Sequence, residues 1–323
     1  MKKIIFILSS LLVIQFIITG VVFWHRNQLE QQQVAKVLFR FKPKQATEIV
    51  ISNNSAKVQL VRHNHQWILP KLDKLPADQT HISDLLSKLT SLKAAWPIAD
   101  TQSAQKRFKV ATGDYHRHIL IKGVNGQILA NVYLGNSPAF RQIHLRLSKH
   151  PSIYQVKLSA YQTSVSPKSW LNTMLLAAKQ PGSIDGSDFK LKRDKDVWQW
   201  QGEINSNKQV LSQTKAAQLS QALGGMTVTD VATKPIQGKP QFILRITQNS
   251  KPLVYRFWHQ NHTYQVARSD YPQHFGLNGA QYKQLAKFSK ITLLHKVKLK
   301  KALKPQLKHH KIKVSKMTPH LAH

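Results

Sequence analysis

Two stretches of this 323-residue sequence repeat the same order of patterns, and this repetition restricts the fold more than any other feature. In each stretch, two short alternating segments joined by a polar turn carry an arginine and, five positions later, a tryptophan: Arg62 and Trp67, then Arg193 and Trp198. A helical pattern and another hairpin pattern follow each pair in the same order. A period of about 130 residues is too long for a solenoid repeat and predicts two homologous domains.

Each predicted domain is α+β, with an antiparallel sheet and one main helix packed on it. In the first, the β-branched alternation of residues 48–52 predicts a strand, and the spacing of apolar residues over 82–92 predicts one buried helix face. Val-Asn-Gly between two apolar segments predicts a hairpin. The predicted segments are a basic N-terminus at 1–3, a membrane anchor at 4–24, a stalk at 25–45, a first repeat at 46–165, a linker with a short helix at 166–183, a second repeat at 184–290 and a basic Lys/His-rich tail at 291–323.

Residues 4–24 form one apolar run without an ionisable side chain. As an α-helix this run would span about 30 Å, the thickness of the hydrocarbon core. It is longer than the apolar part of a cleaved signal peptide, and it ends in Val-Val-Phe-Trp instead of a small-residue cleavage site. A cleaved signal and a buried soluble helix are the alternatives. We expect an uncleaved signal-anchor, with Ile4, Leu11, Phe16 and Trp24 as its markers.

The orientation of the anchor follows less directly from charge, because basic residues flank both ends of the run. Long domains translocate largely regardless of charge. We therefore predict a single-pass protein of the inner (cytoplasmic) membrane, with its N-terminus inside and the bulk of the chain in the periplasm or outside.

Charge is the most unusual feature of the composition. Lys and Arg number 48 against 14 Asp and Glu, a formal net charge of +34. A chain of this charge attracts anionic lipid, anionic surface polymers or nucleic acid. The tail carries several lysines and no acid, and its candidate polyanion-binding residues are Lys296, Lys298, Lys300, Lys301 and Lys304.

The search for catalytic chemistry is mostly negative. The absence of cysteine excludes disulfides, thiolate metal sites and cysteine nucleophiles. No nucleophile elbow, phosphate-binding glycine loop or His-Glu-x-x-His motif occurs. We expect no enzyme activity, no cofactor and no metal. The pairs His63/His65 and His116/His118 could supply two ligands each, whereas a tight site needs three or four.

Aromatic residues have two interpretations. Trp67 and Trp198 occupy matched positions and are interpreted as duplicated core anchors, although ligand stacking is the alternative. The segment 253–259 interleaves aromatic with basic residues, as in a nucleic-acid surface, but its alternation also suits a half-buried strand. Nucleic acid is the less favoured partner.

Several short motifs carry a resemblance to a known family. In the first repeat they are Leu60-x-Arg62-x4-Trp67, Pro70, Pro76-Ala77-Asp78, the Leu-rich helix and Tyr133-Leu134-Gly135. In the second they are Leu191-x-Arg193-x4-Trp198 and Phe275-Gly276-Leu277, without the Pro-Ala-Asp step. Over roughly residues 46–290 the chain resembles the domain-of-unknown-function 4340 family, apparently as two tandem copies.

The resemblance implies a role but no catalytic residue. The family includes parts of auxiliary proteins of gliding-motility-type ABC transporters, and stand-alone proteins with one N-terminal membrane helix and a large envelope domain. We therefore expect a non-enzymatic, membrane-anchored envelope protein, an accessory or scaffold component of an ABC-type transport or surface-assembly system. The alternative is a membrane-tethered protein that binds a polyanion through its basic surface and tail. The expected partners are the membrane, ABC-transporter subunits, and anionic lipid or surface polymer.

Overall fold

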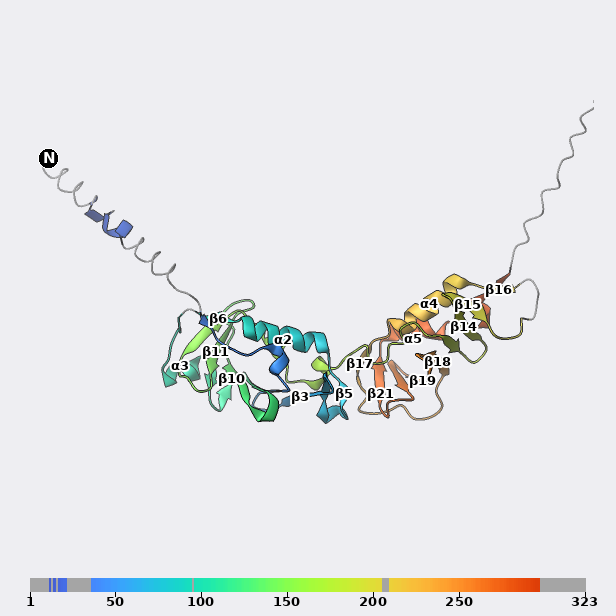
Figure 1. Ribbon diagram of the computed structural model, residues 1–323, viewed down its shortest axis with the longest axis horizontal. Coiled ribbons are helices and arrows are strands. Elements are labelled where there is room, and N and C mark those ends of the chain that lie inside the picture. Colours follow the sequence, from blue (N-terminus) through green and yellow to red (C-terminus); the bar gives the residue numbers. More distant parts are fainter. Residues whose placement is uncertain are drawn as a thin grey trace, which may run out of the picture.

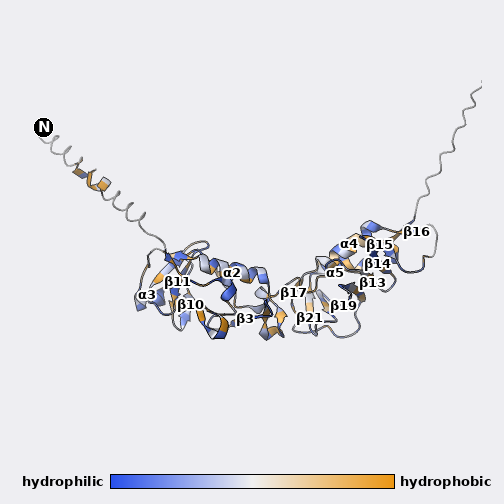
Figure 2. Cartoon of the chain, in the orientation of Figure 1, coloured by the Kyte–Doolittle hydropathy of each residue, from blue (hydrophilic) through white to orange (hydrophobic). Residues whose placement is uncertain are grey.

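The computed structural model describes residues 12, 14–15, 17–21, 36–94, 96–204 and 209–296 (Figure 1). Within these ranges no helix is both long enough and apolar enough to cross a lipid bilayer. The described residues between 12 and 21 are mainly helical and hydrophobic (Figure 2). The predicted marker residues that lie outside the described ranges are Ile4, Leu11, Phe16, Trp24, Lys298, Lys300, Lys301 and Lys304.

The first domain is built on an eight-stranded sheet in the order β12-β11-β10-β9-β2-β3-β4-β5. All its neighbouring strands are antiparallel. Its strands are β2 (Glu48–Ser52), β3 (Lys57–His63), β4 (Gln66–Leu69), β5 (Leu75–Pro76), β9 (Arg117–Lys122), β10 (Ile128–Leu134), β11 (Ile143–Leu147) and β12 (Ile153–Val156). One long helix, α2 (Gln79–Ser91), lies across the sheet (Figure 1).

The second domain has its own eight-stranded antiparallel sheet, in the order β15-β14-β13-β18-β19-β20-β21-β17. Its strands are β13 (Ser183–Asp185), β14 (Lys190–Asp194), β15 (Val197–Trp200), β17 (Val228–Val231), β18 (Phe242–Gln248), β19 (Lys251–Gln260), β20 (Thr263–Arg268) and β21 (His274–Leu277). Helices α4 (Gln213–Gly224) and α5 (Gly279–Ala286) lie against it (Figure 1). The predicted mixture of helices with antiparallel sheets is therefore confirmed.

Short elements complete both domains. The paired strands are β1 (Lys36–Val37) with β6 (Lys93–Ala94), β7 (Val110–Ala111) with β8 (Asp114–Tyr115), and β16 (Gln209–Leu211) with β22 (Leu294–Lys296). The short helices are η1 (Pro43–Gln45), η2 (Pro70–Leu72), α3 (Gln102–Arg107), η3 (Val124–Gly126), η4 (Ala160–Thr163), η5 (Pro167–Trp170) and α6 (Lys290–Leu293).

The two sheets have the same connectivity. Seven strands of each sheet have the same spatial order and the same sequence along the chain. They are β4-β3-β2-β9-β10-β11-β12 in the first sheet and β15-β14-β13-β18-β19-β20-β21 in the second. In both domains, the main helix follows the first three of these strands along the chain and precedes the other four. β5 extends the first sheet beyond β4, and β17 extends the second beyond β21.

The main helices form where capping and apolar spacing coincide. The Asp78 carboxylate accepts hydrogen bonds from the backbone N–H groups of Thr80 and His81, which satisfies the first turn of α2. Ser212 caps α4 in the same way through the N–H of Lys215. Each helix buries one apolar face on its sheet. The buried residues are Ile82, Leu85, Leu86 and Leu89 in α2, and Ala216, Leu219 and Leu223 in α4.

The join between the domains, predicted as a linker with a short helix, is anchored by several buried residues. Trp170 is fully buried, stacks on His81 with ring centroids 4.2 Å apart, and accepts a hydrogen bond from the Asp78 N–H at its carbonyl. Farther along, Leu176 is buried and Ala178 donates its N–H to the Leu223 carbonyl of α4. Buried residues of both sheets therefore form one continuous hydrophobic cluster.

Both ends of the folded region extend past the predicted boundaries. Phe39 and Phe41, assigned to the stalk, are buried in the first domain, and β1 pairs with β6. Residues 291–296, assigned to the tail, complete α6 and β22 of the second domain. In each case a few buried apolar residues attach a polar or basic segment to the folded domain.

Candidate functional site

A groove on the first domain is formed by two adjoining hollows. It lies between the C-terminal end of α2, the loop that joins β10 to β11, and the segment after β12. Two adjoining cavities of about 600 Å³ and 390 Å³ share Lys88, Gln142 and Lys157. The other lining residues are Ser91, Leu92, Lys93, Phe140, Arg141, Gln155, Val156, Leu158, Ser159, Tyr161 and Gln162. We call this hollow the Lys88 groove.

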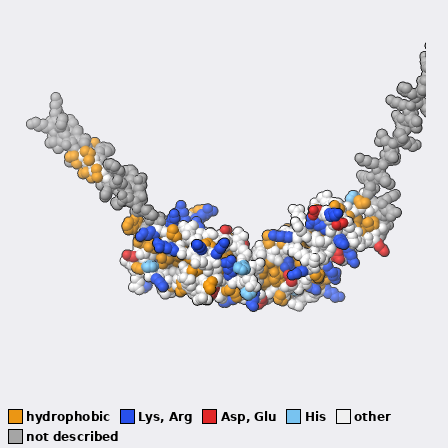
Figure 3. All heavy atoms as spheres, viewed as in Figure 1, with side chains coloured by type: hydrophobic (Ala, Val, Ile, Leu, Met, Phe, Trp, Pro, Cys, Tyr) orange, Lys and Arg blue, Asp and Glu red, His pale blue; other side chains and the backbone are white. Residues whose placement is uncertain are grey.

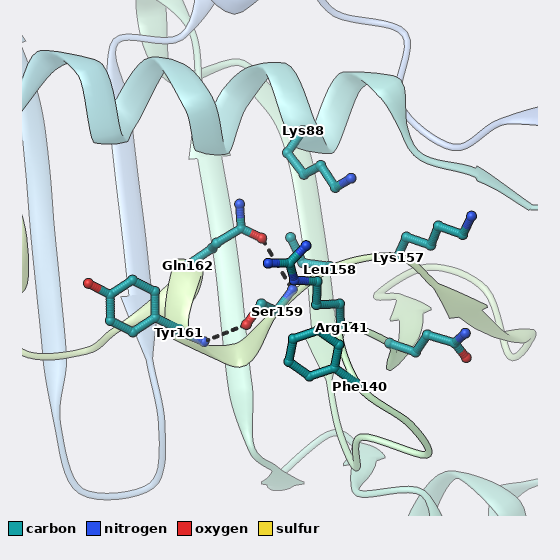
Figure 4. Close-up of a pocket in the computed structure, with 9 residues that line it drawn as sticks. Lys88, Phe140, Arg141, Lys157, Leu158, Ser159, Tyr161 and Gln162 are labelled. Atoms are coloured by element: carbon teal, nitrogen blue, oxygen red, sulfur yellow. Dashed lines mark hydrogen bonds between the residues drawn. The ribbon is translucent and has the colours of Figure 1, made fainter.

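Four cations line the Lys88 groove, and none of its lining residues is acidic. Lys88 extends from the last turn of α2, and Arg141 lies on the facing loop (Figure 4). Lys93 is in β6, and Lys157 directly follows β12. None of the ion pairs formed among the described residues involves these four side chains. The groove therefore concentrates positive charge that the protein itself does not neutralise.

Two aromatic rings stand at the rim of the groove, facing water. Phe140 is 85% exposed and Tyr161 is 82% exposed. The guanidinium carbon of Arg141 lies 4.9 Å from the centroid of the Phe140 ring, a cation–π distance. Phenylalanine is usually buried, so such exposure indicates a surface available for contact. An aromatic face beside a cation can stack on a planar or ring-shaped ligand while the cation binds its charge.

Local hydrogen bonds hold one wall of the groove in place. The Ser159 hydroxyl accepts from the Tyr161 N–H at 3.4 Å, and the Ser159 N–H donates to the Gln162 side-chain carbonyl at 3.2 Å (Figure 4). This capping arrangement fixes η4 at the end of β12. Leu158 is buried beneath it. The wall is thus part of the folded domain, which suits a site formed before its ligand arrives.

The groove supplies basic and neutral polar groups. No histidine or carboxylate lies among the lining residues, so the Ser159 hydroxyl has no general base beside it there. Amide side chains of Gln142, Gln155 and Gln162 add neutral hydrogen-bonding groups. Cations, amides and exposed rings together fit an extended anionic ligand.

The matched Arg and Trp residues lie elsewhere, in the hairpins β3–β4 and β14–β15. Arg62 faces Trp67 across β3 and β4, and Arg193 faces Trp198 across β14 and β15. Both tryptophans are buried. Their positions on the two sheets are equivalent.

A glutamine at the start of each main helix joins that helix to its hairpin. The Gln79 side chain accepts from the Trp67 N–H at 2.9 Å and donates to the Trp67 carbonyl at 3.0 Å. Gln213 makes the same two bonds with Trp198, at 2.9 and 2.7 Å. Sequence comparison missed this pair because the spacing from Trp to Gln differs between the repeats.

A second polar cluster, in the second domain, has a structural role. The Tyr255 hydroxyl donates to the Leu176 carbonyl at 2.8 Å and accepts from Arg268, whose guanidinium pairs with Asp270. Burial raises the pKa of Tyr255. The cluster fixes the buried join to β19 and β20 of the second sheet.

The remaining predicted residues do not meet at a common site. Lys296 is exposed in β22, opposite Gln209 of β16, in the other domain from the groove. His63 and His65 flank a tight turn, and both His116 and His118 have a ring nitrogen within hydrogen-bonding distance of another residue. Among the described residues no three His, Asp or Glu side chains are grouped to hold a metal ion.

The strand that interleaves aromatic and basic residues exposes Arg256 and His259 but not its aromatic rings. Tyr255, Phe257 and Trp258 of β19 are all buried. The groove, in contrast, had no signal in the sequence beyond the excess of basic residues, because its cations come from four separate segments.

Comparison with known families places these features in context. Residues 67–242 match the family described as Domain of unknown function (DUF4340). No curated protein and no solved structure matches the chain. The matched range runs from β4 of the first sheet to the first residue of β18 in the second, and it includes the Lys88 groove and the buried join. Since this range covers more than half of the sequence, the chain is a member of the DUF4340 family.

Proposed function

We propose that this chain is a non-enzymatic, membrane-anchored envelope protein that binds an anionic polymer in the Lys88 groove. The observation that carries the proposal is the set of four cations lining a hollow that contains no carboxylate. The anchor is supported by the apolar run at residues 4–24, and its outward orientation by the length of the chain that comes after it.

The physical basis of binding is the release of counterions from the polymer. Each cation that contacts a charge of the polymer displaces a condensed counterion, so affinity falls steeply with salt. The rings of Phe140 and Tyr161 add a contact that does not depend on salt, and it favours polymers that contain sugar rings. An acidic glycan of the cell envelope therefore fits the groove better than a bare phosphate chain.

A role as a scaffold within a transport or surface-assembly system is compatible with this binding. It rests on the family resemblance and on the continuous core, which would hold both domains as one unit near the membrane. The matching connectivity of the two sheets supports the idea that they are tandem copies. Reproducible recovery of transporter subunits after gentle detergent extraction would support the scaffold role, and their consistent absence would count against it.

The binding proposal is tested with full-length protein in detergent and heparin as the acidic glycan. The test variant combines Lys88→Gln, Arg141→Gln and Lys157→Gln. The control combines Lys57→Gln, Lys71→Gln and Lys106→Gln, which removes the same charge from exposed positions outside the groove. We expect the test variant to lose at least about tenfold in affinity and its log–log salt slope to decrease by about two to three units. Equal losses in both variants would mean that the groove is not the site.

Two further experiments test which class of polymer binds and whether the groove or the tail binds it. Phe140→Ala with Tyr161→Ala should weaken heparin binding and leave polyphosphate binding unchanged, because polyphosphate has no sugar ring. Truncation after Lys296 removes the basic tail while keeping β22 intact. If truncation abolishes binding and the groove variant does not, the tail carries the function instead.

A further inference from the structure

A second surface of the first domain combines exposed apolar and basic residues. Trp96 is 67% exposed, Ile98 is 45% exposed and Val37 is 41% exposed. Lys36 and Lys93 are exposed beside them. We call these five residues the Trp96 face. Side chains of both kinds gather at the end of the first domain where β6 lies (Figures 1 and 3).

Backbone pairing brings these residues together. Val37 of β1 is opposite Lys93 of β6, and Lys36 is opposite Ala94. Trp96 follows Lys93 by three positions, so their Cα atoms lie within about 11 Å of each other. The Ile98 N–H donates to the Ile153 carbonyl at 2.8 Å, which ties this segment to the edge strand β12. The face is therefore held on the folded domain.

The composition of the face is that of a membrane interface. Tryptophan is enriched at the headgroup level of bilayers, where its ring is apolar and its N–H remains hydrated. Lysines near a bilayer are attracted to anionic headgroups, at about 1 kcal/mol each. Asp100 is the exposed carboxylate of the same segment, and the two lysines outnumber it. A water-exposed tryptophan with two aliphatic neighbours is otherwise an unfavourable surface.

The position of the face along the chain identifies its partner. Lys36 follows the end of the apolar run by twelve positions. Even a fully extended chain of this length reaches at most about 43 Å. A run embedded in the bilayer would therefore keep this end of the first domain close to the headgroups.

We propose that the Trp96 face docks on the surface of an anionic lipid bilayer, with Trp96 and Ile98 among the headgroups and Lys36 and Lys93 near lipid phosphates. This inference rests on the membrane anchor of the proposed function. It adds an orientation: since Lys93 also lines the smaller cavity of the Lys88 groove, the groove opens beside the membrane. The polymer would then be bound at the bilayer surface.

The absence of cysteine makes a direct test possible, because a single introduced cysteine is the only labelling site. Full-length protein carrying Ile98→Cys is labelled with an environment-sensitive fluorophore and reconstituted into nanodiscs of phosphatidylcholine and phosphatidylglycerol. The matched control is Val197→Cys, a 52% exposed aliphatic position in the edge hairpin of the second domain. We expect a blue-shifted, brighter emission at position 98 and the emission of a water-exposed label at position 197.

Two comparisons test whether the two lysines and the anionic lipid cause the emission shift at position 98. Lys36→Gln with Lys93→Gln should reduce the shift at position 98, and so should nanodiscs of phosphatidylcholine alone. If the protein is retained in the discs but the label at position 98 reports water, docking is wrong and anchoring stands. If the protein does not remain with the discs, anchoring and docking are both wrong.

Discussion

The two domains share one framework and differ most in the segment after the last strand of the common order. In the second domain, residues 278–289 contain the eight-residue helix α5, which packs beside α4. In the first, the shorter segment 157–166 forms only the four-residue turn η4. The Lys88 groove lies between this turn and α2. The same sheet is therefore covered by a helix in one domain and bordered by an open groove in the other.

The aromatic residues of these segments show the same contrast. Tyr282 of α5 is only 7% exposed and packs against the rings of Phe242 and Tyr264. Tyr161 of η4 is 82% exposed at the rim of the groove. One tyrosine completes a core, and the other is available to a ligand. The proposed binding role therefore rests on the first domain.

The largest expected effect comes from Trp170 and Leu293, two buried residues that contact the start of the main helix in their domains. The Trp170 carbonyl accepts from the N–H of Asp78, and the Leu293 carbonyl accepts from the N–H of Ser212, so the two residues are equivalent. Both side chains are fully buried. In urea titrations we expect Trp170→Ala to lower the free energy of unfolding by about 3–5 kcal/mol and Leu293→Ala by about 2–4 kcal/mol.

Trp170 and Leu293 differ in whether they lie between the two domains. Since Trp170 lies in the join, its loss should separate unfolding into two transitions, whereas loss of Leu293 should leave the first domain unaffected. Met174→Ala, at a partly exposed position in the same join, is the control and should cost less than about 1 kcal/mol. A single transition for Trp170→Ala would show that coupling between the domains does not depend on Trp170.

A smaller effect tests whether the hairpins β3–β4 and β14–β15 are held in the same way. Gln79→Ala and Gln213→Ala each remove two hydrogen bonds to a tryptophan backbone, and we expect each to cost about 1–2 kcal/mol in the same titrations. Gln79 should cost more, because it also donates to the Ala77 carbonyl at 2.8 Å. Gln221→Ala, on the exposed side of α4, should be neutral, since Ala is the better helix former. A cost at only one of the two glutamines would mean that the hairpins are not equivalent in energy.

Local periodicity was enough to predict the sheets and the main helices. The alternation of residues 48–52 and the spacing of the apolar residues in α2 are properties of neighbouring positions. The buried join was not predicted, because its Pro and Gly content is typical of exposed loops and its burial depends on both domains. The early start of the first domain rests on the buried residues Phe39 and Phe41 and on the pairing of β1 with β6, which is distant in sequence.

The candidate site was less predictable than the fold. The cations of the Lys88 groove come from α2, β6, a loop and the end of β12, and nothing in their spacing relates them. The exposed state of Phe140 and Tyr161 depends on the absence of a covering helix, which a sequence pattern does not reveal. The tail lysines, in contrast, were predicted from the density of lysine in one short segment of the sequence.

The smallest expected effect compares one histidine from each domain. His144 of β11 packs against Phe108 with ring centroids 4.4 Å apart, and its Nδ1 is buried without a hydrogen-bond partner. His274 of β21 stacks on Trp258, also at 4.4 Å. Burial lowers the pKa of both side chains. The two strands occupy neighbouring places in the shared order, so each sheet contains one such histidine near its last strands.

The sign of the pH dependence is set by these lowered pKa values. As the pH falls below about 6.5, the unfolded chain takes up a proton at each histidine before the folded chain does. Stability that is present above this pH is therefore lost progressively as the pH falls towards the folded-state pKa of each group. His144→Gln and His274→Gln should each make the unfolding free energy less dependent on pH in this window, with exposed His262→Gln as the control for the substitution itself. Because burial is the main cause of both lowered pKa values, each substitution should reduce the pH dependence in the same direction. An unchanged pH dependence in either variant would mean that burial of that histidine does not disfavour its charged ring.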